Sequence, residues 1–128
     1  MTHLLRGAIA AVVLAVSVAS LSGCALSSLA ANTSHAQLVA AAESKLKSEL
    51  SNAAIAADSY AVDNDGSYLG ANLTALESDG LGASDVPTEF TIVVNQSGTA
   101  ICMQGATKYG QTTHVTEDGT LAAGACPA

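Results

Sequence analysis

The sequence predicts an α+β fold, in which one long N-terminal α-helix packs on a three- to four-stranded antiparallel β-sheet. Apolar residues recur at helical steps of three and four between residues 39 and 60. Short alternating segments separated by glycine-containing turns fill residues 90–123. Helix and strands lie in separate parts of the chain, which favours α+β. The 128 residues suit one domain, whose core is thin because 26 residues are Ala and four are aromatic.

The N-terminus has the features of an export signal. Arg6 is the only charged residue before the apolar run 7–21, and this run of 15 residues is shorter than the roughly 20 that span a bilayer. The tetrapeptide LSGC at residues 21–24 follows, and it resembles the lipobox of bacterial lipoproteins. The resemblance implies that Cys24 receives a diacylglycerol and that cleavage removes the signal peptide 1–23. The protein is then expected to be exported and lipid-anchored to the outer face of a bacterial membrane.

The mature protein would start at Cys24 and contain 105 residues with a net charge of −8. Its first part, residues 24–33, is small, polar and unpatterned, and we interpret it as a lipidated tether to a domain that spans 34–128. An uncleaved membrane anchor stays an alternative, because no charged residue lies between Arg6 and Glu43.

Two cysteines remain after Cys24 is assigned to the lipid. Outside the cytoplasm, Cys102 and Cys126 are expected to form a disulfide. The closed loop of 25 residues would contribute roughly 3.5 kcal/mol in the chain-entropy model. A metal site is the rival interpretation, although there is no Cys-x-x-Cys motif and His114 is the only nearby histidine.

The long helix is predicted to begin near His35 and to end near residues 64–66. Ser34 and Gln37 have the spacing of a capping box, and Gly66 can take the left-handed conformation that ends a helix. The apolar stripe consists of Val39, Ala42, Leu46, Leu50, Ala53, Ala57 and Tyr60. Glu43 and Lys47 have the i,i+4 spacing of an ion pair in the favourable orientation, and Lys45 and Glu49 have the same spacing in the reverse orientation.

The remaining chain predicts one short helix and then strands. Asn72 can cap a helix over residues 73–78, with Leu73 and Leu76 facing inward. Gly80, Gly82 and Pro87 then break regular structure. The predicted strands, which are joined by three short turns, are Phe90–Asn95, Thr99–Thr107, Thr112–Thr116 and Thr120–Ala123.

The segment 56–68 (AADSYAVDNDGSY) is similar to the end of the first helix in type IV pilins and pseudopilins, where a run of the kind A-x-x-Y-x-x-D-N-G-x-Y occurs. Residues 73–76 resemble the short L-x-x-L segment that follows in this family. Cys102 and Cys126 match its paired C-terminal cysteines. The resemblance implies a long helix on an antiparallel sheet, with a disulfide that holds the C-terminal loop.

The N-terminus departs from the pilin pattern. Pilins keep a hydrophobic helical half after a Gly-Phe-type cleavage site, whereas the apolar segment of this chain precedes the lipobox. The expected protein is therefore a pilin-like head on a lipid, and membership of a filament is not carried over from the family.

The composition argues against nucleic acid as a partner and against catalysis. A net charge of −7, with four Lys and Arg, does not provide the basic surface that phosphates need. After Arg6 there is no arginine, and His35 and His114 are the only histidines after the signal. No nucleophile or nucleotide-binding motif occurs. We therefore expect a protein that is not an enzyme and has no cofactor.

Few residues suggest a binding site. Asp63 and Asp65 in an acidic turn are the metal candidates, but Ala61 replaces the first ligand of an EF-hand, and no metal site is assigned. Tyr68 and Tyr109 could form an exposed contact patch or pack over the core.

The sequence therefore predicts a non-enzymatic, lipid-anchored cell-envelope protein whose head binds a protein partner. The partner would belong to a pilus, a secretion system or a DNA-uptake system, and the membrane contact would be the lipid on Cys24. The alternative is a structural or calcium-binding surface lipoprotein without filament association.

Overall fold

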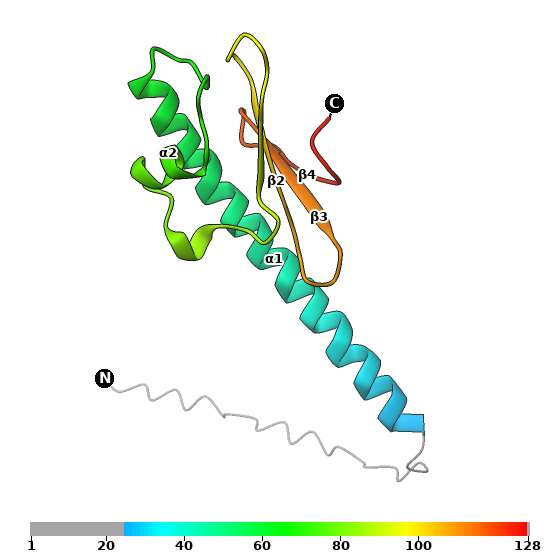
Figure 1. The fold of residues 1–128 in the computed structure, drawn as a ribbon. Helices are drawn as coiled ribbons and strands as arrows, with labels where there is room; N and C mark the ends of the chain where they lie inside the picture. Colours follow the sequence, from blue (N-terminus) through cyan, green and yellow to red (C-terminus); the bar gives the residue numbers. More distant parts are fainter. Residues whose placement is uncertain (1–24, 128) are drawn as a thin grey trace, which may run out of the picture.

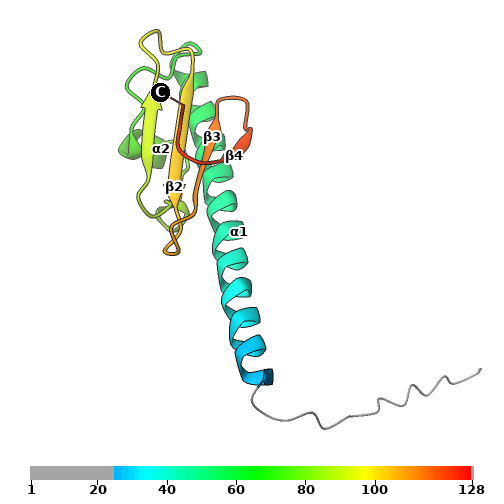
Figure 2. The same cartoon turned by 90° about the vertical axis from the view of Figure 1, so that its right-hand side faces the viewer.

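The computed structural model describes residues 25–127, with side chains from Ser34 onwards, and confirms the α+β fold (Figures 1 and 2). One long helix packs on a four-stranded antiparallel sheet. The predicted signal peptide 1–23 and the predicted lipidation site Cys24 lie outside the described residues. The elements are α1 (Ala25–Asp63), α2 (Leu73–Ser78), the 3-10 helix η1 (Ala83–Asp85), β1 (Thr91–Val94), β2 (Ile101–Ala106), β3 (Thr112–Thr116) and β4 (Leu121–Ala123).

Helix α1 begins earlier than predicted. It starts at Ala25 rather than near His35, so Ser34 lies inside the helix and is not its N-cap. The residues interpreted as a tether, 25–33, continue the helical backbone. They are rich in Ala and Leu, the strongest helix formers, and contain no Gly or Pro that would interrupt a helix. The N-terminal part of α1 therefore projects beyond the sheet (Figure 2).

The C-terminal half of α1 supplies one side of the core. Its buried residues follow the predicted helical period: Leu46, Leu50, Ala53 and Ala57, together with Ala56 and Ala61. The helix ends at Asp63. Gly66 takes the expected left-handed φ of 82°, and its N–H donates to the carbonyl of Ala61 over 2.7 Å.

Tyr68 packs in the core beside this helix end, not in an exposed patch. Its hydroxyl donates to Oδ1 of Asp58 over 3.3 Å. Burial, and then the negative charge of Asp58, raise the pKa of the Tyr68 hydroxyl above its usual value. The Tyr68 phenol therefore stays neutral where it packs against the core.

The sheet is a meander with the order β1-β2-β3-β4. The register places Met103 opposite Ile92 on one side and opposite Val115 on the other. Met103 and Val115 are fully buried, and Ile92 is partly buried against the same core. The inner face of the sheet therefore packs on α1, and the alternate residues form its outer face.

The short helix α2 has the predicted bounds. Asn72 is its N-cap, and its Oδ1 accepts the backbone N–H of Ala75. Leu76 is fully buried as predicted, whereas Leu73 is 37% exposed, so the prediction that both face inward is wrong. A helix of six residues makes fewer than two turns, and its first residue lies at the margin of the contact with α1.

The C-terminal segment lies across the outer face of the sheet. Cys126 forms a disulfide with Cys102 of β2, which confirms the predicted pairing. The N–H of Cys126 donates to Oε1 of Gln104 over 2.7 Å. His114 Nδ1 lies 3.0 Å from the carbonyl oxygen of Gly124. These contacts attach the end of the chain to β2 and β3.

Candidate functional site

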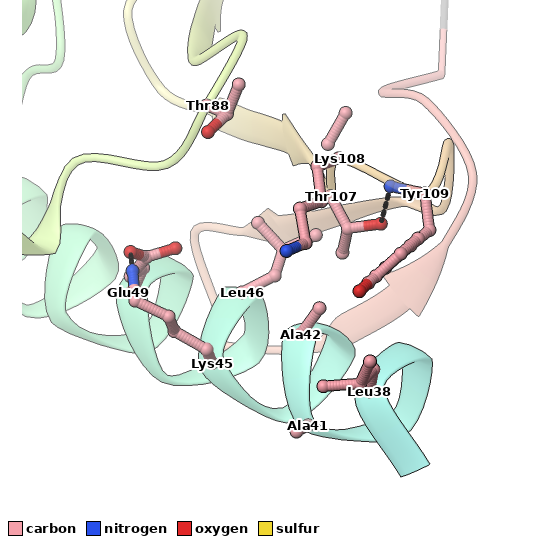
Figure 3. Close-up of a pocket in the computed structure, with 11 residues that line it drawn as sticks. Leu38, Ala41, Ala42, Lys45, Leu46, Glu49, Thr88, Thr107, Lys108 and Tyr109 are labelled. Carbon is pink, nitrogen blue, oxygen red and sulfur yellow. Dashed lines mark hydrogen bonds and ion pairs between the residues drawn. The ribbon is translucent and has the colours of Figure 1, made fainter. Parts of the chain in front are cut away.

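A groove of about 410 Å³ lies between α1 and the turn that joins β2 to β3 (Figure 3). We call it the helix–hairpin groove. Its helix wall consists of residues between Leu38 and Glu49, and its sheet wall consists of residues 106–109 and Thr88. The β2–β3 turn, which supplies the sheet wall, lies beside the part of α1 from which the helix extends past the sheet (Figure 1).

Next to the groove, β2 packs closely on α1 and on Pro87. At Gly105 an added Cβ would lie 2.5 Å from Cβ of Pro87 and 2.9 Å from Cδ1 of Leu46. Only glycine permits this approach, because both distances are shorter than real carbon contacts. The hairpin therefore lies close to the helix here, and the groove opens beyond this contact.

The β2–β3 turn positions the side chains of the sheet wall. The hydroxyl of Thr107 accepts the N–H groups of Tyr109 and Gln111, over 3.2 and 3.3 Å. Gly110 has a left-handed φ of 84°, and its N–H donates to the carbonyl of Thr107. This hydrogen-bonded turn holds Lys108 and Tyr109 above α1 (Figure 3).

The groove combines an open apolar surface with an aromatic rim. Leu38 is 55% exposed, and Ala42 and Leu46 continue the apolar wall along the helix. The ring of Tyr109 meets the ring of His35 edge to face, with centroids 5.5 Å apart. This contact connects the hairpin to the first turns of α1 whose side chains are described.

Charged groups lie on both walls. Glu49 forms the predicted ion pair with Lys45, and the carboxylate side chain is 10% exposed while the lysine side chain is 70% exposed. The Nζ of Lys108 lies 5.0 Å from the centre of the Tyr109 ring, within the range of a cation–π contact. Of the three lysines among residues 25–127, Lys47 alone is outside the groove, in its ion pair with Glu43.

The structure does not bring further ligands to the metal candidates. Asp63 is the last residue of α1, and Asp65 lies in the following turn with a φ of 56°. Both are exposed, and within residues 25–127 no three His, Cys, Asp or Glu side chains lie together as metal ligands would. The turn 63–66 therefore ends the helix, and we build no metal site on it.

The turn between β3 and β4 holds a strongly hydrogen-bonded carboxylate. Asp118 accepts from the hydroxyl of Thr116 at 2.6 Å and from the N–H and hydroxyl of Thr120 at 3.0 and 2.8 Å. These bonds, the Thr116 hydroxyl first, lower the pKa of Asp118 to about 2. All of them are local, so the carboxylate stabilises the turn.

No family model, curated protein or solved structure matches this chain. Within the described part of the chain, no helix combines the length and the apolar character needed to cross a membrane.

The groove could be predicted from the sequence only in part. Tyr109 is one of the two tyrosines predicted as contact residues, and the structure places it, partly buried, in the lining of the groove. Lys45 and Lys108 were not candidates, because 63 positions separate them in the chain. Helical spacing from Leu38 through Ala42 and Lys45 to Glu49 does put these residues on one side of α1, but nothing in the sequence shows which hairpin covers them.

Proposed function

We propose that this protein is a non-enzymatic, lipid-anchored component of the cell envelope whose head binds a protein partner through the helix–hairpin groove. The observation that carries the proposal is the groove itself. It combines exposed apolar surface, a tyrosine and two lysines on a head that is otherwise acidic. Concave sites with an apolar wall and a few convergent polar groups are typical binding sites.

The lipobox-like sequence supports the cellular location in this proposal. A diacylglycerol on Cys24 would hold the N-terminal end of α1 at the membrane surface. From Ala25 to Leu38 the helix rises about 20 Å, at 1.5 Å per residue. The groove would then lie above the membrane surface, where a membrane-associated partner can reach it.

The similarity to pilins supports the class of partner. The order of the pilin-like motifs and the long helix packed on an antiparallel sheet agree with a pilin-like head. A partner in a pilus, a secretion system or a DNA-uptake system is therefore part of the proposal. The head would act as an anchored binding module beside such a machine rather than as a filament subunit.

Quantitative capture from host membranes tests this function. Partners are recovered with the wild-type protein, with Ala42→Trp, which fills the groove, and with Ile55→Trp. Ile55 is 68% exposed and does not line the groove, so the third protein controls for an added tryptophan on α1. We expect one component to be recovered with the wild type and the control but lost with Ala42→Trp. Equal recovery with all three proteins would contradict the groove as the binding site.

A further inference from the structure

We propose that the occupant of the helix–hairpin groove is a short apolar peptide segment that carries a carboxylate, either as an Asp or Glu side chain or as a C-terminus. This inference rests on the proposed function, because it specifies the chemistry of the partner at the same groove. It depends on the charge, the size and the hydrogen-bonding groups of the groove.

The charge of the groove is opposite to that of the whole chain. Lys45 and Lys108 line it, and Glu49 is its only acidic residue, which leaves a formal charge of +1. The complete chain has 11 acidic residues and a net charge of −7. A cationic site on an anionic surface favours an anionic group on the partner and disfavours other orientations of that partner.

The two lysines differ in their availability. Lys45 is already paired with Glu49, whereas Lys108 has no ion pair among residues 25–127. The Nζ of Lys108 lies over the ring of Tyr109. Because its side chain is exposed and this contact leaves its N–H donors available, Lys108 is the residue that we expect to receive the carboxylate.

The size of the groove favours a short peptide segment, rather than the surface of a folded protein, as its occupant. A volume of about 410 Å³ lies in the range of small-ligand sites. Leu38, Ala42 and Leu46 form a continuous apolar wall on α1 beneath the hairpin. This wall suits one or two apolar side chains that enter beside the Tyr109 ring.

The hydrogen-bonding groups favour a peptide over a fatty acid. Glu49 is 8% exposed and, among the described residues, has only Lys45 as a hydrogen-bond partner. The acyl chain of a fatty acid would cover this carboxylate and Thr88 without offering them a donor, which costs desolvation free energy. The N–H groups of a peptide backbone can donate to Glu49 while its side chains cover the apolar wall.

Selection from a displayed library of random heptapeptides on the full-length protein tests this inference. Binders that also bind Ala42→Trp are removed, with Leu38→Glu as a second blocked variant in case the tryptophan prevents folding. We expect the remaining peptides to combine apolar residues with Asp, Glu or a free C-terminal carboxylate. Thermal unfolding of every variant checks that it is folded.

Charge variants then test the role of Lys108. Fluorescence anisotropy of a selected peptide should show at least about tenfold weaker binding to Lys108→Glu, because the substitution removes a favourable charge contact and places a like charge near the carboxylate. Lys108→Arg should retain binding. Lys47→Glu makes the same charge change outside the groove and should alter the affinity by less than about twofold.

The outcomes distinguish this inference from the proposed function. Groove-dependent peptides without a carboxylate, or equal binding to wild type and Lys108→Glu, would overturn the inference and leave the groove as a protein-binding site. Displacement of the peptide by micromolar decanoate would overturn it in favour of an amphiphile. The absence of any groove-dependent peptide would overturn the inference, and the capture experiment with Ala42→Trp then decides the binding function separately.

Discussion

At the scale of single residues, Asp118 shows how local hydrogen bonds stabilise a turn. Three donors from Thr116 and Thr120 surround one exposed carboxylate and lower its pKa from 3.8 to about 2. A lowered pKa in the folded state stabilises the fold wherever the unfolded carboxylate is ionised. The contribution is therefore fully present above pH 4 and disappears as the pH falls from about 4 to about 2.

The pH dependence of Asp118→Asn tests this contribution. The free energy of unfolding of the wild type should decrease between pH 4 and pH 2 by more than that of the variant. Urea unfolding at a series of pH values measures both proteins, and the difference curve isolates Asp118. Glu117→Gln removes the same charge from the same turn and serves as the control. A difference curve that is flat for Asp118→Asn would contradict the assignment.

At the scale of elements, the contact between α1 and β2 depends on Gly105. Its hydrogen is replaced by a methyl group in Gly105→Ala, and that carbon would overlap Pro87 and Leu46. We expect a loss of about 1–3 kcal/mol in the free energy of unfolding, typical of overpacking in a core. Chemical denaturation of the wild type and of Gly105→Ala measures this difference in the free energy of unfolding. Gly110→Ala is the comparison, because nothing lies within 4 Å of its added carbon and only the strain of its positive φ remains.

The disulfide is the second connection between elements. Replacing both Cys102 and Cys126 by Ala should reduce the free energy of unfolding by about 3–4 kcal/mol in the chain-entropy model for this loop. Urea unfolding with and without a reductant measures the effect. The reductant should destabilise the wild type and leave the double variant unchanged. An equal response of both proteins would contradict a structural role for the bridge.

The elements also show what the sequence can predict. Strand positions were predictable because alternation and turn glycines are local signals, and β3 has the predicted bounds. The start of α1 was not predictable, because a helix-favouring segment rich in Ala continues through the apparent cap at Ser34. The groove depends on the approach of Lys108 and Tyr109 to residues 38–49 of α1, which lie at least 59 positions earlier in the chain, and such a contact has no local signal.

At the scale of the whole molecule, the protein as proposed combines a lipid anchor, a projecting helix and a binding head. The helix α1 is the element common to all three. It begins at Ala25, next to the proposed lipidation site, and continues into the head as one wall of the groove. A rigid helix would fix the height and orientation of the groove above the membrane, which a flexible tether would not.

The anchor is tested by Cys24→Ala. Without the thiol no thioether to diacylglycerol can form, so the variant should appear in the soluble fraction of fractionated host cells. The wild type should stay with the membranes and enter the detergent phase on Triton X-114 partition. Cys102→Ala with Cys126→Ala removes the two disulfide-bonded cysteines and should not change the partition. Membrane retention of Cys24→Ala would support an uncleaved anchor instead.

The most direct test of the central claim is site-specific photo-cross-linking in intact host cells. A benzophenone amino acid is placed at Leu38 in the groove or at Ile55, which is exposed on α1 outside it. We predict one adduct of defined mass at Leu38 and none at Ile55, with a lower yield when Lys108→Glu is added. The same adduct at both positions, or no adduct at Leu38, would contradict the groove as the site of partner binding.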